Sequence, residues 1–284
     1  MKYLILEPLG GIANRMRAIE SAVNYSKFHN RKLIIIWEKN VFLNADFFDC
    51  FRPISSVKVI QLDYQGTGFI SKFKRRILNG FKYWLKIYHQ ARYFFDTEME
   101  MLLNQHKNNL IKVGFSLDAI AESANGIYIK SCYEFYPNLT NFMIEIDSEV
   151  QKLGNKIIDD HQCDIGIHIR RTDHVDAISN SPIHLFITKI NERLNSYPNA
   201  KFYLSTDAKD VVNYLQEHFN SHIITGITNR DRNSAEGIRS ALIDLHCLGR
   251  CSEIWGSDQS SFSDRAGRMN KSKLEILSLK NTSA

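Results

Sequence analysis

The sequence has no apolar run long enough to span a lipid bilayer. Nothing in its 284 residues approaches the ~20 uninterrupted apolar positions that a spanning helix needs. The amino terminus also lacks the basic region and cleavage site of a signal peptide, because it enters the apolar segment 3–6 and a glycine turn directly. From these two absences we expect a cytoplasmic protein.

Cysteine is scarce and its spacing is uninformative for a metal or disulfide framework. There are five cysteines, an odd number, and none belongs to a Cys-x-x-Cys pair. Cys247 and Cys251 lie about one helical turn apart, which suits neither a zinc ribbon nor a disulfide scaffold. We therefore expect reduced thiols that are mostly buried.

Three familiar phosphate or metal motifs are missing. The glycine turn at Gly10 and Gly11 is followed by no Gly-Lys-Ser/Thr, so it is no P-loop, and no Gly-x-Gly-x-x-Gly occurs there. The chain also has no strict Asp-x-Asp triplet that would pair carboxylates on a divalent cation. The turn can still bring its backbone close to an anion, because glycine lacks a side chain.

Acidic residues are absent from a strongly basic stretch. Residues 71–92 contain seven Lys and Arg and no Asp or Glu, interleaved with aromatic and aliphatic residues at three- and four-residue spacing. This predicts a basic amphipathic helix, or two helices broken at Asn79-Gly80. The segment 69–92 would either contact a membrane surface peripherally or pack against the core with a basic solvated face. No nucleic-acid-binding module is recognisable, so we expect no nucleic-acid partner.

Strand and helix patterns alternate at the start of the chain. Segment 2–7 reads as a strand and is followed by the glycine turn and one apolar helical face, formed by Ile12, Met16, Ile19 and Val23. The continuously apolar segment 33–37 is typical of a strand in a parallel sheet covered on both faces. The stretch 41–160 reads as loops, the basic segment, further helices and a short strand at 126–130.

The alternation is regular after residue 160. Strands are predicted at 164–170, 201–205, 222–225 and 253–257, and helices at 181–197, 208–219, 234–250 and 260–269. Such repetition favours doubly wound parallel sheets. We expect an α/β fold with two Rossmann-like domains facing a cleft. Residues 1–160 would form the first domain, with a helical insertion, and residues 161–284 the second.

Polar clusters follow three of the predicted strands, where ligands of parallel sheets bind. They are 168–173 (His-Ile-Arg-Arg-Thr-Asp), 205–207 (Ser-Thr-Asp) and 257–261 (Ser-Asp-Gln-Ser-Ser). Arg170 and Arg171 are costly to desolvate without an anion, and a diphosphate matches their guanidinium forks. Alternatively, Asp173 and neighbouring carboxylates satisfy the arginines structurally.

The third cluster lies at a predicted helix start. Ser260 or Ser261 can cap this helix, which explains the serines fully. The free backbone N–H groups of the first turn can equally receive phosphate oxygens.

Four of these segments together resemble the α-1,6-fucosyltransferases. They are 165–174, 203–207, 243–246 and 260–261, in the same order and at similar spacing over roughly residues 163–270. The segment 10–15 is more loosely similar to the glycine-rich first turn of the wider superfamily. The resemblance implies a GT-B-like fold and an inverting transfer of fucose from GDP-fucose to a glycan acceptor. It implies no cofactor and no metal, with the GDP-sugar as substrate.

The resemblance also implies roles for single residues. Arg170 would bind the β-phosphate, and Arg171 would bind phosphate or order the loop. Asp244 would recognise the guanine edge, and Asp207 matches an acidic residue below the donor pocket. The other donor-site residues that it implies are His168, Ser260, Ser261, Gly10, Gly11 and Asn14.

The general base is where the sequence departs from the family. The family glutamate that follows the second arginine by seven residues is Ile178 here. Asp176 and Asp173 are the carboxylates on the same loop, and Asp176 can deprotonate the acceptor if this loop is two residues shorter. Asp176 can equally be a solvated loop carboxylate, with the base supplied by Glu7 or His29 of the first domain.

The acceptor and the donor base also stay open. We expect transfer to a surface polysaccharide or a lipid-linked oligosaccharide, with the basic segment resting on the inner membrane. A UDP- or dTDP-linked donor on the same fold is an alternative. The missing glutamate also suits a non-catalytic protein that binds a GDP-sugar or glycan.

Overall fold

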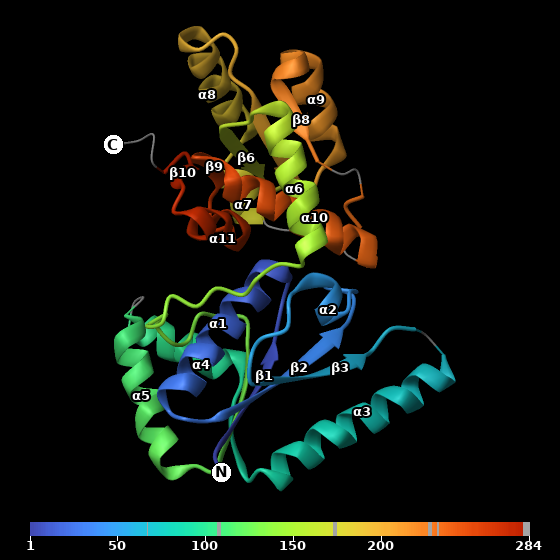
Figure 1. The fold of residues 1–284 in the computed structure, drawn as a ribbon, viewed down its shortest axis with the longest axis vertical. Helices are drawn as coiled ribbons and strands as arrows, with labels where there is room; N and C mark the ends of the chain where they lie inside the picture. The colour runs from blue at the N-terminus through green and yellow to red at the C-terminus, as the bar shows by residue number, and fades with distance from the viewer. Residues whose placement is uncertain (67, 107–108, 173–174, 227–228, 232, 281–284) are drawn as a thin grey trace. The chain divides into compact units, whose positions relative to one another are not determined.

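The computed structural model describes residues 1–66, 68–106, 109–172, 175–226, 229–231 and 233–280. The chain divides into two compact units: Met1–Glu145 with Arg232–Ile238, and Ile146–Asp231 with Arg239–Ala284. Each unit contains a five-stranded sheet in which every strand pair is parallel, with helices on its faces (Figure 1). The predicted α/β class with two Rossmann-like units is confirmed.

The first sheet has the strand order β3-β2-β1-β5-β4. Its strands are β1 (Tyr3–Pro8), β2 (Lys32–Lys39), β3 (Val57–Asp63), β4 (Ala91–Phe94) and β5 (Gly126–Ser131). The helices of this unit are α1 (Ile12–Phe28), α2 (Phe47–Cys50), α3 (Phe69–Tyr88), α4 (Asp96–Gln105) and α5 (Leu110–Ser123). The predicted β-α-β start is confirmed, because α1 connects the neighbouring parallel strands β1 and β2.

The two faces of the first sheet are covered by different helices. Residues of α1 such as Met16 and Ile19 are fully buried, and α1 packs along β1 and β2. The other face forms a core of Ile5, Ile34 and Tyr128, onto which α3 places Leu85. Because helices cover both faces of the sheet, the side chains on both sides of β1 and β2 are buried, which explains why these strands are continuously apolar.

The basic segment forms one uninterrupted helix, so the predicted break at Asn79-Gly80 is wrong. α3 runs for 20 residues through Gly80. A glycine inside a helix costs about 1 kcal/mol relative to alanine, and packing offsets this cost. Leu78 and Phe81, on either side of the glycine, pack against the core of the first sheet.

The second sheet has the strand order β10-β9-β6-β7-β8. Its strands are β6 (Ile165–Ile169), β7 (Phe202–Thr206), β8 (Ile223–Thr225), β9 (Glu253–Ser257) and β10 (Lys273–Leu277). The helices are α6 (Ser148–His161), α7 (Val175–Asn180), α8 (Ile183–Ser196), α9 (Lys209–Phe219), α10 (Ala235–Arg250) and α11 (Ser261–Asn270). Renumbered within the unit, this is the order 5-4-1-2-3 of a doubly wound sheet.

Side-chain alternation assigns the two faces of the second sheet. Ile165, Ile167 and Ile169 point into a core that includes Phe186 of α8 and Leu215 of α9. The intervening residues face α10 and α11. A Cβ on Gly166 would lie 2.8 Å from Leu248, and one on Gly256 would lie 2.6 Å from Ser263, so these strand glycines allow the helices to approach closely.

The structure divides the chain earlier than residue 160. α6 belongs to the second unit, where Gly154 packs against α10 and its carbonyl accepts a bond from the Cys247 thiol. A Cβ on Gly154 would lie 2.7 Å from His246. The close contact between α6 and α10 therefore requires a glycine at position 154. The strand–helix pattern of the sequence does not reveal this contact, so it does not show that α6 belongs to the second unit.

The cysteines and the helix lengths bear on the opening expectations. All five cysteines are free, and Cys50, Cys163, Cys247 and Cys251 are buried, so the prediction that the thiols are mostly buried is confirmed. Among the residues that the structure describes, no helix combines the length and the apolar character needed to cross a membrane.

Candidate active site

The candidate site lies at the carboxyl edge of the second sheet. β6 pairs with β7 on one side and with β9 on the other. The helix α8, which follows β6, packs on one face of the sheet, and α11, which follows β9, packs on the other. Open α/β sheets bind ligands at such a switch point, just beyond the strand ends. The three predicted polar clusters follow β6, β7 and β9, so the fold brings them to adjacent positions.

Arg170 is the first residue after β6 and connects all three strand ends. Its backbone N–H donates to Ser257 Oγ, 3.0 Å away, at the end of β9. Its Nε forms an ion pair with Asp207 Oδ2 at 3.2 Å, just after β7. The Arg170 side chain is 21% exposed, so it is partly accessible to a ligand.

Asp207 holds the turn that follows β6. It accepts bonds from the backbone N–H groups of Arg171 (2.8 Å) and Thr172 (3.3 Å) and from the Thr172 hydroxyl (2.8 Å). Burial opposes ionisation of Asp207. The charge of Arg170 and these hydrogen bonds outweigh burial and hold the pKa of Asp207 below its ordinary value. The arginine turn is therefore anchored by a carboxylate that stays ionised.

Arg171 is directed toward the backbone of its own unit. Its Nη1 donates to the Arg170 carbonyl (2.9 Å) and its Nη2 to the Ser181 carbonyl (2.8 Å). Burial lowers the pKa of Arg171 from its usual value. The resemblance implies that Arg171 either binds phosphate or orders the loop, and these backbone contacts favour the ordering role.

His168 is buried within β6. Its Nδ1 lies 2.7 Å from Ser263 Oγ and 3.4 Å from Ser260 Oγ, and its ring packs against Phe262 at 4.9 Å. With 4% of its surface exposed, His168 connects β6 to the start of α11.

The amino terminus of α11 borders the arginine turn. Ser260 precedes the helix and Ser261 is its first residue, but the Ser260 side chain makes no capping bond to the first turn. The Ser260 hydroxyl approaches His168 instead. The N–H groups of the first helical turn carry partial positive charge and favour an anion.

A second polar group lies on the α10 face of the sheet. Asp244 of α10 accepts bonds from Tyr203 Oη at 2.5 Å and from Ser205 Oγ at 3.1 Å, both from β7. Burial raises the pKa of Asp244 to about 6, and the bonds from Tyr203 and Ser205 oppose this only in part.

Gly226 completes the surroundings of Asp244. It follows β8, and a Cβ there would lie 2.2 Å from Tyr203 Oη and 2.8 Å from Asp244 Oδ1. Only glycine can therefore occupy this position without displacing the Tyr203–Asp244 pair.

Three contributors to these two groups were missed by sequence reasoning. Arg230 donates from Nε to the Thr206 carbonyl (2.8 Å), and its charge lowers the pKa of Asp244. Ser181 is fully buried and its hydroxyl accepts the backbone N–H of Asp258 (2.8 Å). The sequence pattern predicts only that a helix starts at Ser181, and nothing in the local sequence signals Gly226 or Arg230.

The glycine turn of the first unit is built differently from the arginine turn. Gly10 has a φ of +76°, and a Cβ there would lie 2.8 Å from Asn14 Nδ2. Arg15 is fully buried and donates to the carbonyls of Gly10 (3.0 Å) and Glu38 (2.7 Å). Gly11 directly precedes α1, and no atom lies within 4 Å of the position that a Cβ on Gly11 would occupy. Gly10, Gly11 and Asn14 thus form one turn at the carboxyl end of β1, in a different unit from Arg170.

The general-base candidates have different surroundings. Asp176 lies in the first turn of α7 with an exposed side chain, whereas Asp173 lies outside the described residues. Glu7 is 2% exposed and contacts Tyr128 Oη (2.5 Å) and Lys130 Nζ (2.6 Å). Burial opposes ionisation of Glu7, but Lys82, Lys130 and Tyr128 hold its pKa below the usual value, which disfavours Glu7 as a base.

His29 lies at the wrong end of its helix for catalysis at the strand ends. It caps the carboxyl terminus of the 17-residue α1, about 25 Å from the glycine turn at 1.5 Å per residue. Its Nε2 pairs with Asp118 of α5 at 2.5 Å. Within the described part of the chain, no cluster of three or more His, Cys, Asp or Glu side chains could hold a metal ion.

No protein family model and no curated protein sequence matches this chain. Among solved structures, NodZ α-1,6-fucosyltransferase from Bradyrhizobium, soaked with GDP-fucose, superposes with a TM-score of 0.59 at 18% identity, over 95% of this chain and 93% of that one.

Two further structures are also similar. Arabidopsis thaliana FUT1 in complex with GDP superposes with a TM-score of 0.58 at 13% identity, over 97% of this chain and 70% of that one. POFUT1 in complex with GDP gives 0.55 and 13%, over 97% and 98%. The chain therefore has the two-unit, GT-B-like fold of these fucosyltransferase structures.

Proposed function

We propose that this protein is an inverting, metal-independent glycosyltransferase that transfers fucose from GDP-fucose to a glycan acceptor. The observation that carries the proposal is the position of Arg170 at the switch point of the second sheet, between the ends of β7 and β9. The fold similarity to structures containing GDP or GDP-fucose supports the choice of donor.

The chemistry requires positive charge beside the leaving group. When the bond between the sugar and the diphosphate breaks, negative charge grows on the departing oxygen. Arg170 would stabilise this charge, and the N–H groups at the start of α11 would receive further phosphate oxygens. Asp207 would act as a positioning residue, because it fixes the guanidinium and the backbone of the turn.

Asp244 would recognise the guanine. An ionised carboxylate accepts two N–H bonds from the edge of guanine, and the bonds from Tyr203 and Ser205 would orient it. His168, Ser260 and Ser261 would shape the phosphate side of the pocket, and Arg171 would order its loop. Gly10, Gly11 and Asn14 of the first unit would approach the donor through their turn.

Asp176 is our proposed base. It would take the proton of the acceptor hydroxyl as this oxygen attacks the anomeric carbon and GDP leaves with the bonding electrons. Its exposed position on α7, five residues after Arg171, suits a group that meets an acceptor arriving from solvent. The acceptor would be a surface polysaccharide or a lipid-linked oligosaccharide.

A thermal-shift panel of GDP, UDP and dTDP tests the donor. A nucleotide at ~100 times its dissociation constant adds about 2.7 kcal/mol to the free energy of unfolding, and we expect this from GDP alone. Stabilisation by UDP alone would refute the guanine assignment. GDP binding without transfer or donor hydrolysis would identify a non-catalytic binding protein. Transfer lost in excess EDTA and restored by Mn²⁺ would contradict metal independence.

A further inference from the structure

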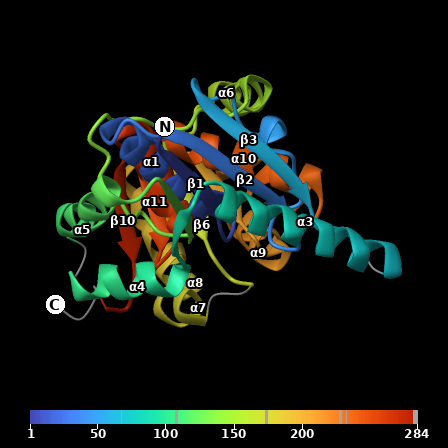
Figure 2. The same cartoon turned by 90° about the horizontal axis from the view of Figure 1, so that it is seen from below.

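The outer face of α3 carries an apolar stripe along the whole helix. Phe69, Phe73 and Ile77 follow one another at four-residue spacing, and Trp84 comes seven residues later, so all four lie on one face. Their exposed fractions are 84%, 59%, 57% and 52%. Further exposed apolar residues beside them are Ile70, Ile87 and Tyr88. In Figures 1 and 2, the amino-terminal half of α3 extends beyond the first sheet.

Packing within the first unit does not explain this stripe. The side of α3 that faces the sheet already carries Leu78, Phe81 and Leu85, which contact the core of that sheet. A helix that packs on one side and meets water on the other needs a single apolar face. On α3 the apolar surface extends beyond that side, and the side chains of the stripe stay more than half exposed.

Most basic residues of α3 are committed within the unit. Lys74 pairs with Asp63 at 3.1 Å, and Arg75 donates to the Gly66 carbonyl at 2.8 Å. Lys82 pairs with Glu7 at 3.4 Å and with Glu38. We call the basic residues of α3 that contact other residues of the first unit the inner set, and the remaining ones the outer set.

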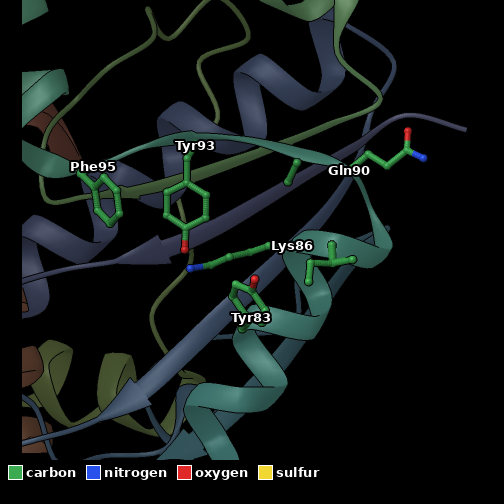
Figure 3. Close-up of a pocket in the computed structure, with 7 residues that line it drawn as sticks. Tyr83, Lys86, Gln90, Tyr93 and Phe95 are labelled. Atoms are coloured by element: carbon green, nitrogen blue, oxygen red, sulfur yellow. The ribbon is translucent and has the colours of Figure 1, made fainter.

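Lys86 belongs to the inner set. Its ammonium lies 3.8 Å from the centre of the Tyr93 ring, and Figure 3 shows it directed toward that ring. Burial lowers the pKa of Lys86 from its ordinary value. A groove of about 450 Å³ lies here between α3 and β4. Its lining includes the exposed Ile87 and Phe95, so apolar surface continues from α3 to the residue that follows β4.

Lys72 and Arg76 form the outer set. They are four residues apart, so they lie on one flank of the apolar stripe, and neither pairs with any residue that the structure describes. No acid occurs between Asp63 and Asp96 in the sequence. An anionic surface can therefore approach this side of α3 without repulsion from the same segment.

We propose that α3 docks in the headgroup region of an anionic lipid membrane. The stripe from Phe69 to Trp84 would enter the boundary between headgroups and acyl chains, while Lys72 and Arg76 would contact lipid phosphates. Trp84 and Tyr88 are residue types that favour this interface. The helix would lie in the plane of the membrane. This inference does not depend on the donor assignment, because α3 lies in the first unit.

Vesicle co-sedimentation of the full chain tests the proposal. We expect binding to vesicles of phosphatidylcholine with phosphatidylglycerol, weakened by salt, and little binding to phosphatidylcholine alone. The double variant Lys72→Gln/Arg76→Gln should bind about 25-fold more weakly, at about fivefold per basic residue. The double variant Phe73→Glu/Ile77→Glu should lose binding at any salt concentration.

Matched controls separate docking from general effects. Phe115→Glu changes an exposed phenylalanine on α5 of the same unit, and Lys152→Gln/Lys156→Gln removes two exposed lysines at the same spacing on α6. Both controls should bind like the unmodified protein, and thermal unfolding should show all variants folded.

Three results would overturn the proposal. The first is equal binding to neutral and anionic vesicles. The second is unchanged binding of either α3 double variant. The third is a dimer in sedimentation velocity that Phe73→Glu/Ile77→Glu dissociates, without vesicle binding, since this would assign the stripe to a second copy of the chain.

Discussion

Replacing Asp207 by asparagine should loosen the arginine turn and destabilise the second unit. The contacts of the carboxylate include Arg170 Nε at 3.2 Å, the N–H groups of Arg171 and Thr172, and the Thr172 hydroxyl. Asparagine keeps one acceptor oxygen but removes the charge. A hydrogen bond to a charged group contributes about 1.5–3 kcal/mol. Because the Asp207 side chain is 14% exposed and partly screened, we expect a loss of about 2 kcal/mol.

Urea unfolding followed by circular dichroism measures this loss, and pH adds a second readout. The pKa of Asp207 is lowered in the folded state, so its stabilisation is present above the unfolded value near 4 and is lost as the pH falls through the folded value. Asp207→Asn should remove this part of the acid dependence. Asp210→Asn is the control, since Asp210 is exposed and accepts no side-chain hydrogen bond from the residues described. A change below 0.5 kcal/mol, roughly the range of ordinary surface substitutions, would refute the anchoring role.

Other expectations follow from the same geometry. Gly226→Ala places a Cβ 2.2 Å from Tyr203 Oη, so it should weaken GDP binding at least tenfold in calorimetry, while UDP binding stays negligible in both proteins. Because burial raises the pKa of Asp244 to about 6, GDP affinity should fall up to tenfold per unit as the pH drops below 6; a flat profile would exclude an ionised Asp244 from base recognition. Asp176→Asn should lower kcat by about 10²–10⁴ with GDP affinity unchanged; unaltered turnover would locate the base elsewhere.

The sheets were predictable where their strands are buried on both faces. The segments 2–7, 33–37 and 164–170 are apolar enough to be recognised from sequence alone, and the glycine turn marks the first connection. The overlooked strands β3, β4 and β10 are half-buried and include both edges of the first sheet and one edge of the second. Edge strands pack less apolar surface, so their sequences mix charged and apolar residues and resemble loops.

The candidate site was predictable in part. Strand ends and residue type identified Arg170, Asp207 and Ser260, because ligands of parallel sheets bind there. The ion-pair partner of Arg170 is Asp207, which lies 37 positions later in the sequence. The pairing of β6 with β7 brings the two residues together, and local sequence does not show this pairing. Likewise, Arg171 turns toward the Ser181 carbonyl, a backbone contact that residue identity does not encode.

The central claim is that Arg170 binds the donor diphosphate, and a calorimetric titration of GDP tests it most directly. Arg170→Ala should weaken GDP binding about 10- to 150-fold, since a charge-assisted bond contributes about 1.5–3 kcal/mol. Arg170→Lys should recover only part of this, and Arg239→Ala, which removes an exposed arginine paired with Glu149, should bind GDP normally. Unchanged GDP affinity in a folded Arg170→Ala protein would contradict the account.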